Sequence, residues 1–224
     1  MHHDFEVSYL HLSDGQPGLA VYLADAPKQM LRMFDEVARA ELRKLSGGHG
    51  DVFVRISDLP LHDAIHELRR TYCDVLVKTS GVVTHRSGVF RQLQHAAFDC
   101  SSCGAAAGEP SWQDVPSSGF GKPASCARCH STGPFAVSEA RSRESRYQKV
   151  TLQERPGSLA AGRMPRCLDV VLTNSLIDAV RLGDHVEVTG IYTQRFDASL
   201  NAAAGVPDFQ VALLANHVRR CAAT

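Results

Sequence analysis

The pattern of hydrophobic and polar positions changes its period along the chain, from helical spacing to strand spacing near residue 75. Between Lys28 and Leu45, apolar side chains recur every three or four residues and charged residues occupy the opposite face. This pattern predicts an amphipathic helix packed against a core. Val52 to Ile56 predicts a short strand, and Asp63 to Arg70 a further helical segment. Residues 1–72 therefore predict a mainly helical subdomain.

From residue 75 onward apolar and polar residues alternate, as in half-buried strands. Six segments carry this alternation and are expected to form strands: Val75 to Thr84, Val89 to Phe98, Tyr147 to Glu154, Cys167 to Leu172, His185 to Gln194 and Phe209 to His217. A turn should join the first two, and the last two should form a long β-hairpin with its tip near Asp197 to Pro207. Thr173 or Asn174 is expected to cap a short helix that ends at Gly183. Several strands with one short helix predict a small closed barrel of the oligonucleotide-binding (OB) type.

Two Cys-x-x-Cys motifs interrupt the strand pattern, Cys100 with Cys103 and Cys126 with Cys129. Four thiolates at this spacing can close a tetrahedron around one Zn²⁺, and they leave no open position for water or a substrate. The segment between the motifs is rich in Gly, Pro, Ser and Ala and cannot build a core. We therefore expect a structural zinc site, whose metal supplies on the order of 10 kcal/mol of folding free energy.

Two other interpretations of these cysteines stay open on the residues alone. Cys126 to His130 fits the Cys-x-x-Cys-His signature of c-type haem attachment, although haem would leave the first motif unexplained. A thiol-disulfide redox pair is the other, although neither motif follows an evident strand-to-helix junction. His95 and His130 are expected to be bystanders rather than ligands. Trp112 is expected either to cover the metal site or to stack on a base.

Charge and composition narrow the classes of partner. Lys plus Arg equals Asp plus Glu, at 24 each, and the sequence pI is about 7.2. Bulk charge therefore draws the chain neither to nucleic acid nor to anionic membranes, and any such binding must come from a local patch or from assembly. No apolar run approaches the ~20 residues of a membrane-spanning helix, and the N-terminus lacks a signal-peptide layout, so no membrane partner is expected. The seven cysteines, four in metal spacing and three scattered, suit a reducing cytosol or nucleus.

Several stretches of the sequence resemble the N-terminal domain of the minichromosome maintenance (MCM) helicase subunits: Thr79 to Thr84, Tyr147 to Glu154, Pro156 to Arg166, Asp169 to Leu172 and Val188 to Tyr192. A second set is similar to one subunit type within that family: Tyr22 to Pro27, Val54 to Leu61, Phe196 to Asn201 and Leu213 to Val218. The resemblance implies a mixed α and β fold in three parts. These are a helical subdomain over residues 1–72, truncated at its start, a five-stranded OB-fold barrel over 73–98 and 138–220, and an inserted four-cysteine zinc subdomain over 99–137.

The resemblance also implies a function. In the family this N-terminal tier forms a ring around DNA, the zinc subdomains of two rings meet head to head, and a separate C-terminal ATPase domain is the motor. Gly121-Lys122 is followed by Pro123 and lacks the earlier glycine of a phosphate-binding loop. We therefore expect a non-catalytic fragment of a nuclear helicase subunit. Its expected partners are other MCM subunits in a heterohexamer and single- or double-stranded DNA, with one Zn²⁺. The alternative is a stand-alone single-stranded-DNA-binding protein.

Four basic residues are candidates for phosphate contacts: Arg86, Arg91, Lys149 and Arg195. Arg86 and Arg91 flank the expected turn, near positions that carry basic DNA-binding residues in some family members, whereas an ordinary solvated role is the alternative for both. The dense basic run of Arg141, Arg143, Arg146 and Lys149 has Glu139 and Glu144 interspersed, which favours a solvated, partly self-paired surface.

The segment from Glu154 to Arg166 resembles the family's loop for communication between the two tiers. Its candidate residues are Glu154, Pro156, Gly162, Arg163, Pro165 and Arg166. This loop is expected to be exposed and mobile.

Overall fold

The computed structural model describes residues 2–46, 51–107, 111–112, 123–138, 141–155, 162–196 and 209–221. The chain divides into two compact units, Met1–Gly88 with Gln148–Thr224, and Val89–Tyr147. Both boundaries between the units fall inside strands, β3 (Leu76–Ala96) and β7 (Arg143–Gln153). The three-part division expected from the sequence stays a prediction. None of the helices in the described ranges has the length and apolar character needed to cross a lipid bilayer.

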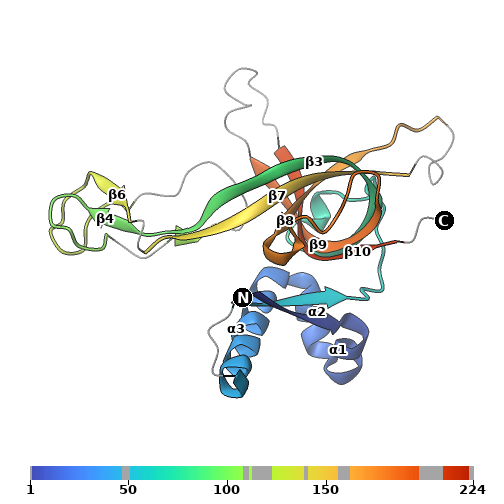
Figure 1. The fold of residues 1–224 in the computed structure, drawn as a ribbon, viewed down its shortest axis with the longest axis horizontal. Coiled ribbons are helices and arrows are strands. Elements are labelled where there is room, and N and C mark those ends of the chain that lie inside the picture. Colours follow the sequence, from blue (N-terminus) through green and yellow to red (C-terminus); the bar gives the residue numbers. More distant parts are fainter. Residues whose placement is uncertain are drawn as a thin grey trace. The chain divides into compact units, whose positions relative to one another are not determined.

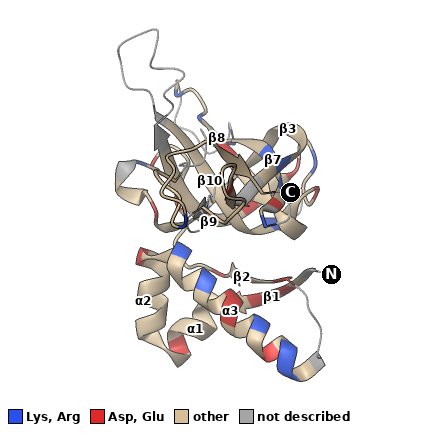
Figure 2. Ribbon diagram, turned by 90° about the vertical axis from the view of Figure 1, so that its left-hand side faces the viewer, with Lys and Arg blue, Asp and Glu red and all other residues tan. Residues whose placement is uncertain are grey.

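The first unit begins with a small sheet and three helices (Figure 1). Its elements are β1 (His2–Ser8), α1 (Tyr9–Gly15), α2 (Pro17–Asp25), α3 (Pro27–Ser46) and β2 (Asp51–Ser57). Proline is the first residue of both α2 and α3, where the backbone N–H that it lacks would have no partner within the helix. Leu23 and Met30 pack against Val54 and Ile56 of β2 in one apolar cluster. Lys, Arg, Asp and Glu alternate along α3 (Figure 2). The expected amphipathic helix and the short strand are confirmed.

One strand in this region was not expected, and one expected helix is absent. β1 was not expected, and it pairs in parallel with β2 over the register His2↔Asp51 to Ser8↔Ser57. The helical segment expected at Asp63 to Arg70 is absent, and only a short 3-10 helix, η1 (Arg70–Tyr72), follows it. The backbone N–H of Asp63 donates to the carbonyl of Lys78, and that of His66 to a carboxylate oxygen of Glu154. Because these donors bond outside the segment, they are not available for helical turns.

The main sheet contains the remaining long strands, β8 (Cys167–Thr173), β9 (His185–Phe196) and β10 (Phe209–Arg220), together with β3, β7 and the short β5 (Ser111–Trp112). The strand order is β5-β3-β7-β8-β10-β9, and β3 also pairs with β9. The order of the five long strands therefore returns to its starting point. β8 and β10 run in parallel, whereas β10 and β9 are antiparallel. Aliphatic residues from all five strands, including Val77, Leu152, Val170, Val188 and Leu213, are buried in one cluster.

The turn expected between the first two strands is wrong, because β3 runs through it as one strand of 21 residues. Ser87 lies at this position, and its hydroxyl accepts the N–H of Lys149 while its carbonyl accepts the side-chain amide of Gln148. These bonds hold β3 to β7 where Ser and Gly suggested a turn. The expected helix ending at Gly183 is also wrong. Only the 3-10 helix η3 (Asn174–Leu176) forms, because the N–H of Asp178 donates to the side chain of Gln148.

β9 and β10 form the long hairpin, paired from Phe196↔Phe209 to Val186↔Arg220. Its tip, residues 197–208, lies outside the described residues. The register shifts between Ala215 and His217, which leaves Asn216 as an extra residue in a β-bulge. Gly190 faces this bulge, and a Cβ at that position would collide with the carbonyl of Leu214. A glycine is therefore required at this position, where the backbone of β10 leaves no room for a side chain.

Candidate metal centre and nucleic-acid interface

The four cysteines of the two motifs converge in the second unit. Cys100 is the last residue of β4 (Phe98–Cys100), which pairs with β6 (Phe135–Val137), and the other three cysteines lie outside strands. Their sulfur atoms all lie within 4.8 Å of one another. The Sγ–Sγ distance is 3.6 Å between Cys100 and Cys129, and 3.7 Å between Cys103 and Cys126. A tetrahedral zinc site with Zn–S bonds of about 2.3 Å has sulfurs about 3.8 Å apart. The donor set and its spacing therefore fit zinc.

The two motifs share one backbone geometry. In each, the residue after the second cysteine donates its N–H to the carbonyl of the first cysteine, at 2.8 Å from Gly104 and 3.0 Å from His130. Both residues adopt left-handed backbone conformations, with φ of 66° and 55°. His130 therefore occupies the place that glycine holds in the first motif, and its side chain is exposed. This turn directs both cysteines of a motif toward the shared centre.

Hydrogen bonds to the sulfurs set their acidity. The backbone N–H of Cys103 is the main cause that lowers the pKa of Cys100, and the N–H of Cys129 is the main cause that lowers the pKa of Cys126 to about 6. The N–H of Ser131 acts in the same direction on Cys129, but contacts with the other three thiols, together with burial, outweigh it and raise the pKa of Cys129 to about 12. Four sulfurs this close cannot all ionise without a cation between them. The cluster is therefore suited to a divalent metal.

The arrangement of the thiols also bears on the redox alternative. The two printed thiol contacts, at 3.6 and 3.7 Å, each join cysteines of different motifs, and all four sulfurs share one centre. Phe98, Ala107 and Phe135 bury Cys100 and Cys126 in a small apolar cluster.

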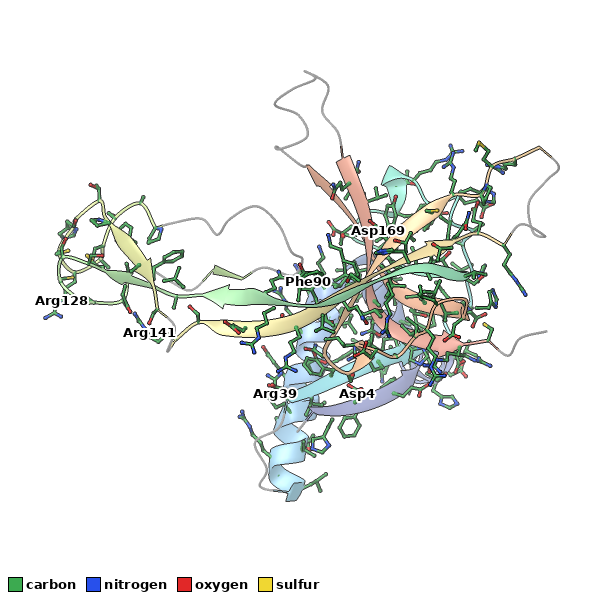
Figure 3. The ribbon with its side chains drawn as sticks, turned by 45° about the horizontal axis from the view of Figure 1, so that its top comes forward. Asp4, Arg39, Phe90, Arg128, Arg141 and Asp169 are labelled. Atoms are coloured by element: carbon green, nitrogen blue, oxygen red, sulfur yellow. The ribbon has the colours of Figure 1, made fainter. Side chains whose placement is uncertain are left out.

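Arg141, labelled in Figure 3, forms an ion pair with Asp99 of β4. The side chains of His95 and Trp112 lie outside the described residues.

The candidate DNA-contacting residues do not form one cluster. Arg86 forms an ion pair with Asp178 at 3.2 Å and donates to the carbonyl of Val180. Arg91 pairs more loosely with Glu144, at 3.8 Å, and both side chains are exposed. Lys149 is exposed and has no ion-pair partner within the described residues. The backbone of Arg195 pairs with Gln210, and its side chain is not described. Lys149 is therefore the most available for a phosphate among the three candidates whose side chains the structure describes.

Hydrogen bonds to the Glu154 side chain hold the two ends of the loop from Glu154 to Arg166 together. The Glu154 carboxylate, 5% exposed, accepts the N–H of Arg166 at 2.9 Å, and both the N–H and Nδ1 of His66 at 2.7 and 2.8 Å. Burial raises the pKa of Glu154, but the hydrogen bonds from Arg166 and His66 outweigh it and hold this pKa below its ordinary value. Pro156 lies outside the described residues, whereas Gly162 and Arg163 are exposed and Pro165 is half-buried.

Asn216, at the β-bulge, joins β10 to the small N-terminal sheet. Its Oδ1 accepts the N–H of Ile56 at 2.7 Å, and its Nδ2 donates to the carbonyl of Val54 at 2.8 Å. The Arg55 guanidinium donates to the carbonyl of Asn216 and to Ser175. The Asn216 side-chain amide thus makes the backbone hydrogen bonds to β2 that a neighbouring strand would otherwise make. Sequence reasoning missed both Asn216 and His66. A polar Asn inside the apolar run of β10 was the one available signal.

Comparison with known proteins matches residues 64–196 to the family model described as the MCM OB domain. Among similar proteins, the DNA replication licensing factor MCM2 of Oryza sativa subsp. japonica is 42% identical over 222 residues, 96% of this chain and 22% of its own length. The proteins of that name from Schizosaccharomyces pombe and Drosophila melanogaster are 43% and 42% identical, over 95% and 96% of this chain and 26% and 24% of theirs. The chain thus spans about a quarter of the length of these relatives.

Proposed function

Since this chain belongs to the minichromosome maintenance family, we propose that it is the N-terminal, non-catalytic module of a eukaryotic replicative helicase subunit of the subunit-two type. In this role it assembles with other MCM subunits into a ring that encircles DNA. One observation carries the proposal: the four-cysteine cluster lies within the span that matches the MCM OB domain. The licensing-factor names of the relatives and their extent over nearly the whole chain support it.

The strand order supports an OB-type barrel as the part that lines the channel. Five long strands whose pairing returns from β9 to β3, with one parallel pair, fit a five-stranded barrel. We propose that this barrel comprises residues 73–98 and 138–220, with a helical subdomain before it and the zinc subdomain inserted into it. The OB barrel is a common scaffold for binding single-stranded nucleic acid.

Zinc is proposed as the one cofactor, held by Cys100, Cys103, Cys126 and Cys129. A closed four-thiolate site supplies folding free energy and no catalytic chemistry. The zinc-bearing part would meet its counterpart in a second ring head to head, and the complex would work in the nucleus.

The loop from Glu154 to Arg166 is proposed to contact the motor tier of the full-length subunit. Glu154 would act as a positioning residue, because its carboxylate holds Arg166 and His66 at the base of the loop. Exposed Gly162 and Arg163 would then be presented to the motor from a fixed base. The fragment itself is not expected to hydrolyse ATP, and ATP-driven unwinding would belong to the parent protein.

The alternative function, a stand-alone single-stranded-DNA-binding protein, is less well supported. Its tight binding would require unpaired cations, but Arg86 is already paired with Asp178 and Arg91 with Glu144. The neutral net charge adds no long-range attraction to DNA. Phosphate contacts by Lys149 and Arg195 would act mainly within the assembled ring.

Assembly tests the proposal directly. The zinc-loaded chain would be mixed with the N-terminal domains of the other MCM subunits, and the molar mass followed by size-exclusion chromatography with light scattering. Stoichiometric complexes that include this chain are the expected result. Failure to enter any complex, while the other domains assemble among themselves, would contradict the proposed function.

A further inference from the structure

Two aromatic rings, one exposed and one half-buried, meet in the second unit. Phe90 of β3 and Tyr147 of β7 have ring centroids 5.7 Å apart and ring planes inclined by 34°. Phe90, labelled in Figure 3, is 49% exposed, and its neighbour Val89 is 44% exposed. This pair belongs to none of the apolar clusters formed by the buried residues. Burial in a core therefore does not account for the two rings.

The strands that carry these rings are strongly basic. Within the second unit, the parts of β3 and β7 that carry the rings contain three basic residues, Arg91, Arg143 and Arg146, and one acidic residue, Glu144. Glu144 is occupied by Arg91. Arg146 adjoins Tyr147, is exposed, and has no ion-pair partner within the described ranges. The local field around the rings therefore favours a polyanion.

We infer that Phe90 and Tyr147 form a stacking subsite for the bases of single-stranded nucleic acid. Exposed aromatic faces bind any base, at about 1 to 3 kcal/mol per stacked base, and surrounding cations attract the phosphates. A protein-binding surface would place its exposed aromatics in a core depleted of charge, which is the opposite of this setting. The inference rests on the proposed function, since it assigns part of the DNA contact to these two side chains rather than to basic residues alone.

The test compares two oligonucleotides of equal length, an oligothymidylate and an abasic strand that has the same phosphates but no bases. Fluorescence anisotropy would measure the affinity of the chain for each, alone and with neighbouring MCM N-terminal domains present. The variant is Phe90→Leu combined with Tyr147→Leu, which keeps apolar bulk and removes both rings. Tyr22→Leu is the matched control, because Tyr22 is 65% exposed on α2 and is not part of the pair.

The double variant should bind oligothymidylate about ten-fold more weakly, as expected for the loss of one stacked base. Its affinity for the abasic strand and its salt dependence should not change, and Tyr22→Leu should match the wild type. Equal affinity of variant and wild type for oligothymidylate would overturn the subsite while leaving the proposed function intact. So would a variant that binds DNA normally but no longer joins neighbouring domains, because the rings would then be a protein interface. If the wild-type chain binds neither strand, even with its neighbours, the DNA contact of the proposed function fails as well.

Discussion

Replacing Asn216 with Ala should destabilise the first unit more than any surface substitution on the same strand. The change removes the acceptor of the Ile56 N–H and the donor to the Val54 carbonyl, both at buried positions of β2. Each buried polar group left unsatisfied costs about 1 to 3 kcal/mol, so the two together should lower the free energy of unfolding by about 2 to 6 kcal/mol. That loss is a large share of the ~5 to 15 kcal/mol of a typical domain.

Urea denaturation followed by far-UV circular dichroism would measure this loss as a lower transition midpoint with an unchanged m-value. Gln210→Ala is the matched control, since Gln210 is an exposed residue of the same strand and should change the free energy by less than about 0.5 kcal/mol. Asn216→Asp keeps an acceptor for Ile56 but places a carboxylate against the Val54 carbonyl. It should therefore be as damaging as Ala at neutral pH, and less so in acid, where the protonated group can donate. An Asn216→Ala variant as stable as Gln210→Ala would refute the role assigned to the bulge.

Three further predictions follow from the same contacts. The chain should bind one Zn²⁺ by mass spectrometry and give a tetrahedral thiolate absorption spectrum with Co²⁺, and Cys126→Ser should abolish both. His130→Gly should keep the wild-type zinc affinity, because glycine adopts the left-handed backbone conformation of His130 at no cost. Loss of zinc in His130→Gly would instead make His130 a ligand. Gly190→Ala should lower the free energy of unfolding by about 1 to 3 kcal/mol, because the added Cβ collides with the Leu214 carbonyl. Gly18→Ala, in open space on helix α2, should raise it by about 0.5 to 1 kcal/mol. Equal midpoints of thermal unfolding for the two variants would contradict this prediction. Because the pKa of Glu154 is lowered from 4.5, its contribution to the free energy of unfolding should be present above about pH 4.5 and lost as the pH falls through the folded-state pKa. Glu154→Gln should therefore be less stable than the wild type at pH 7 and equal to it in acid, as urea denaturation at both pH values would show. A difference in stability that does not depend on pH would contradict the role given to the Glu154 carboxylate.

Features written in local sequence were predicted well. The helix α3 follows from apolar spacing, and the metal cluster from two short motifs whose backbone turns direct each pair of cysteines to one side. The strands β8, β9 and β10 follow from period-two alternation. Each of these signals lies within about twenty residues, so it does not depend on the rest of the fold.

The wrong or missing predictions share one physical cause, which is competition from distant partners. Ser87 and Gly88 favour a turn locally, but hydrogen bonds from β7 keep them in a strand. The segment near His66 favours a helix locally, but Glu154, 88 residues away, takes its backbone donor. The hydrogen bond from the Ile56 N–H to the side chain of Asn216 joins residues that are 160 positions apart in the sequence. Neither periodicity nor motif spacing encodes contacts of this kind.

The most direct test of the central claim is the affinity of the zinc-loaded chain for single-stranded and duplex DNA at two salt concentrations, measured alone and then with the N-terminal domains of the other MCM subunits. A module that works within a ring should bind weakly alone, because Arg86 and Arg91 are already paired with carboxylates and the net charge is zero, and its affinity should rise when its neighbours are added. Tight binding by the isolated chain with a steep salt dependence, unchanged by the neighbours, would contradict that claim and make the chain a DNA-binding protein in its own right.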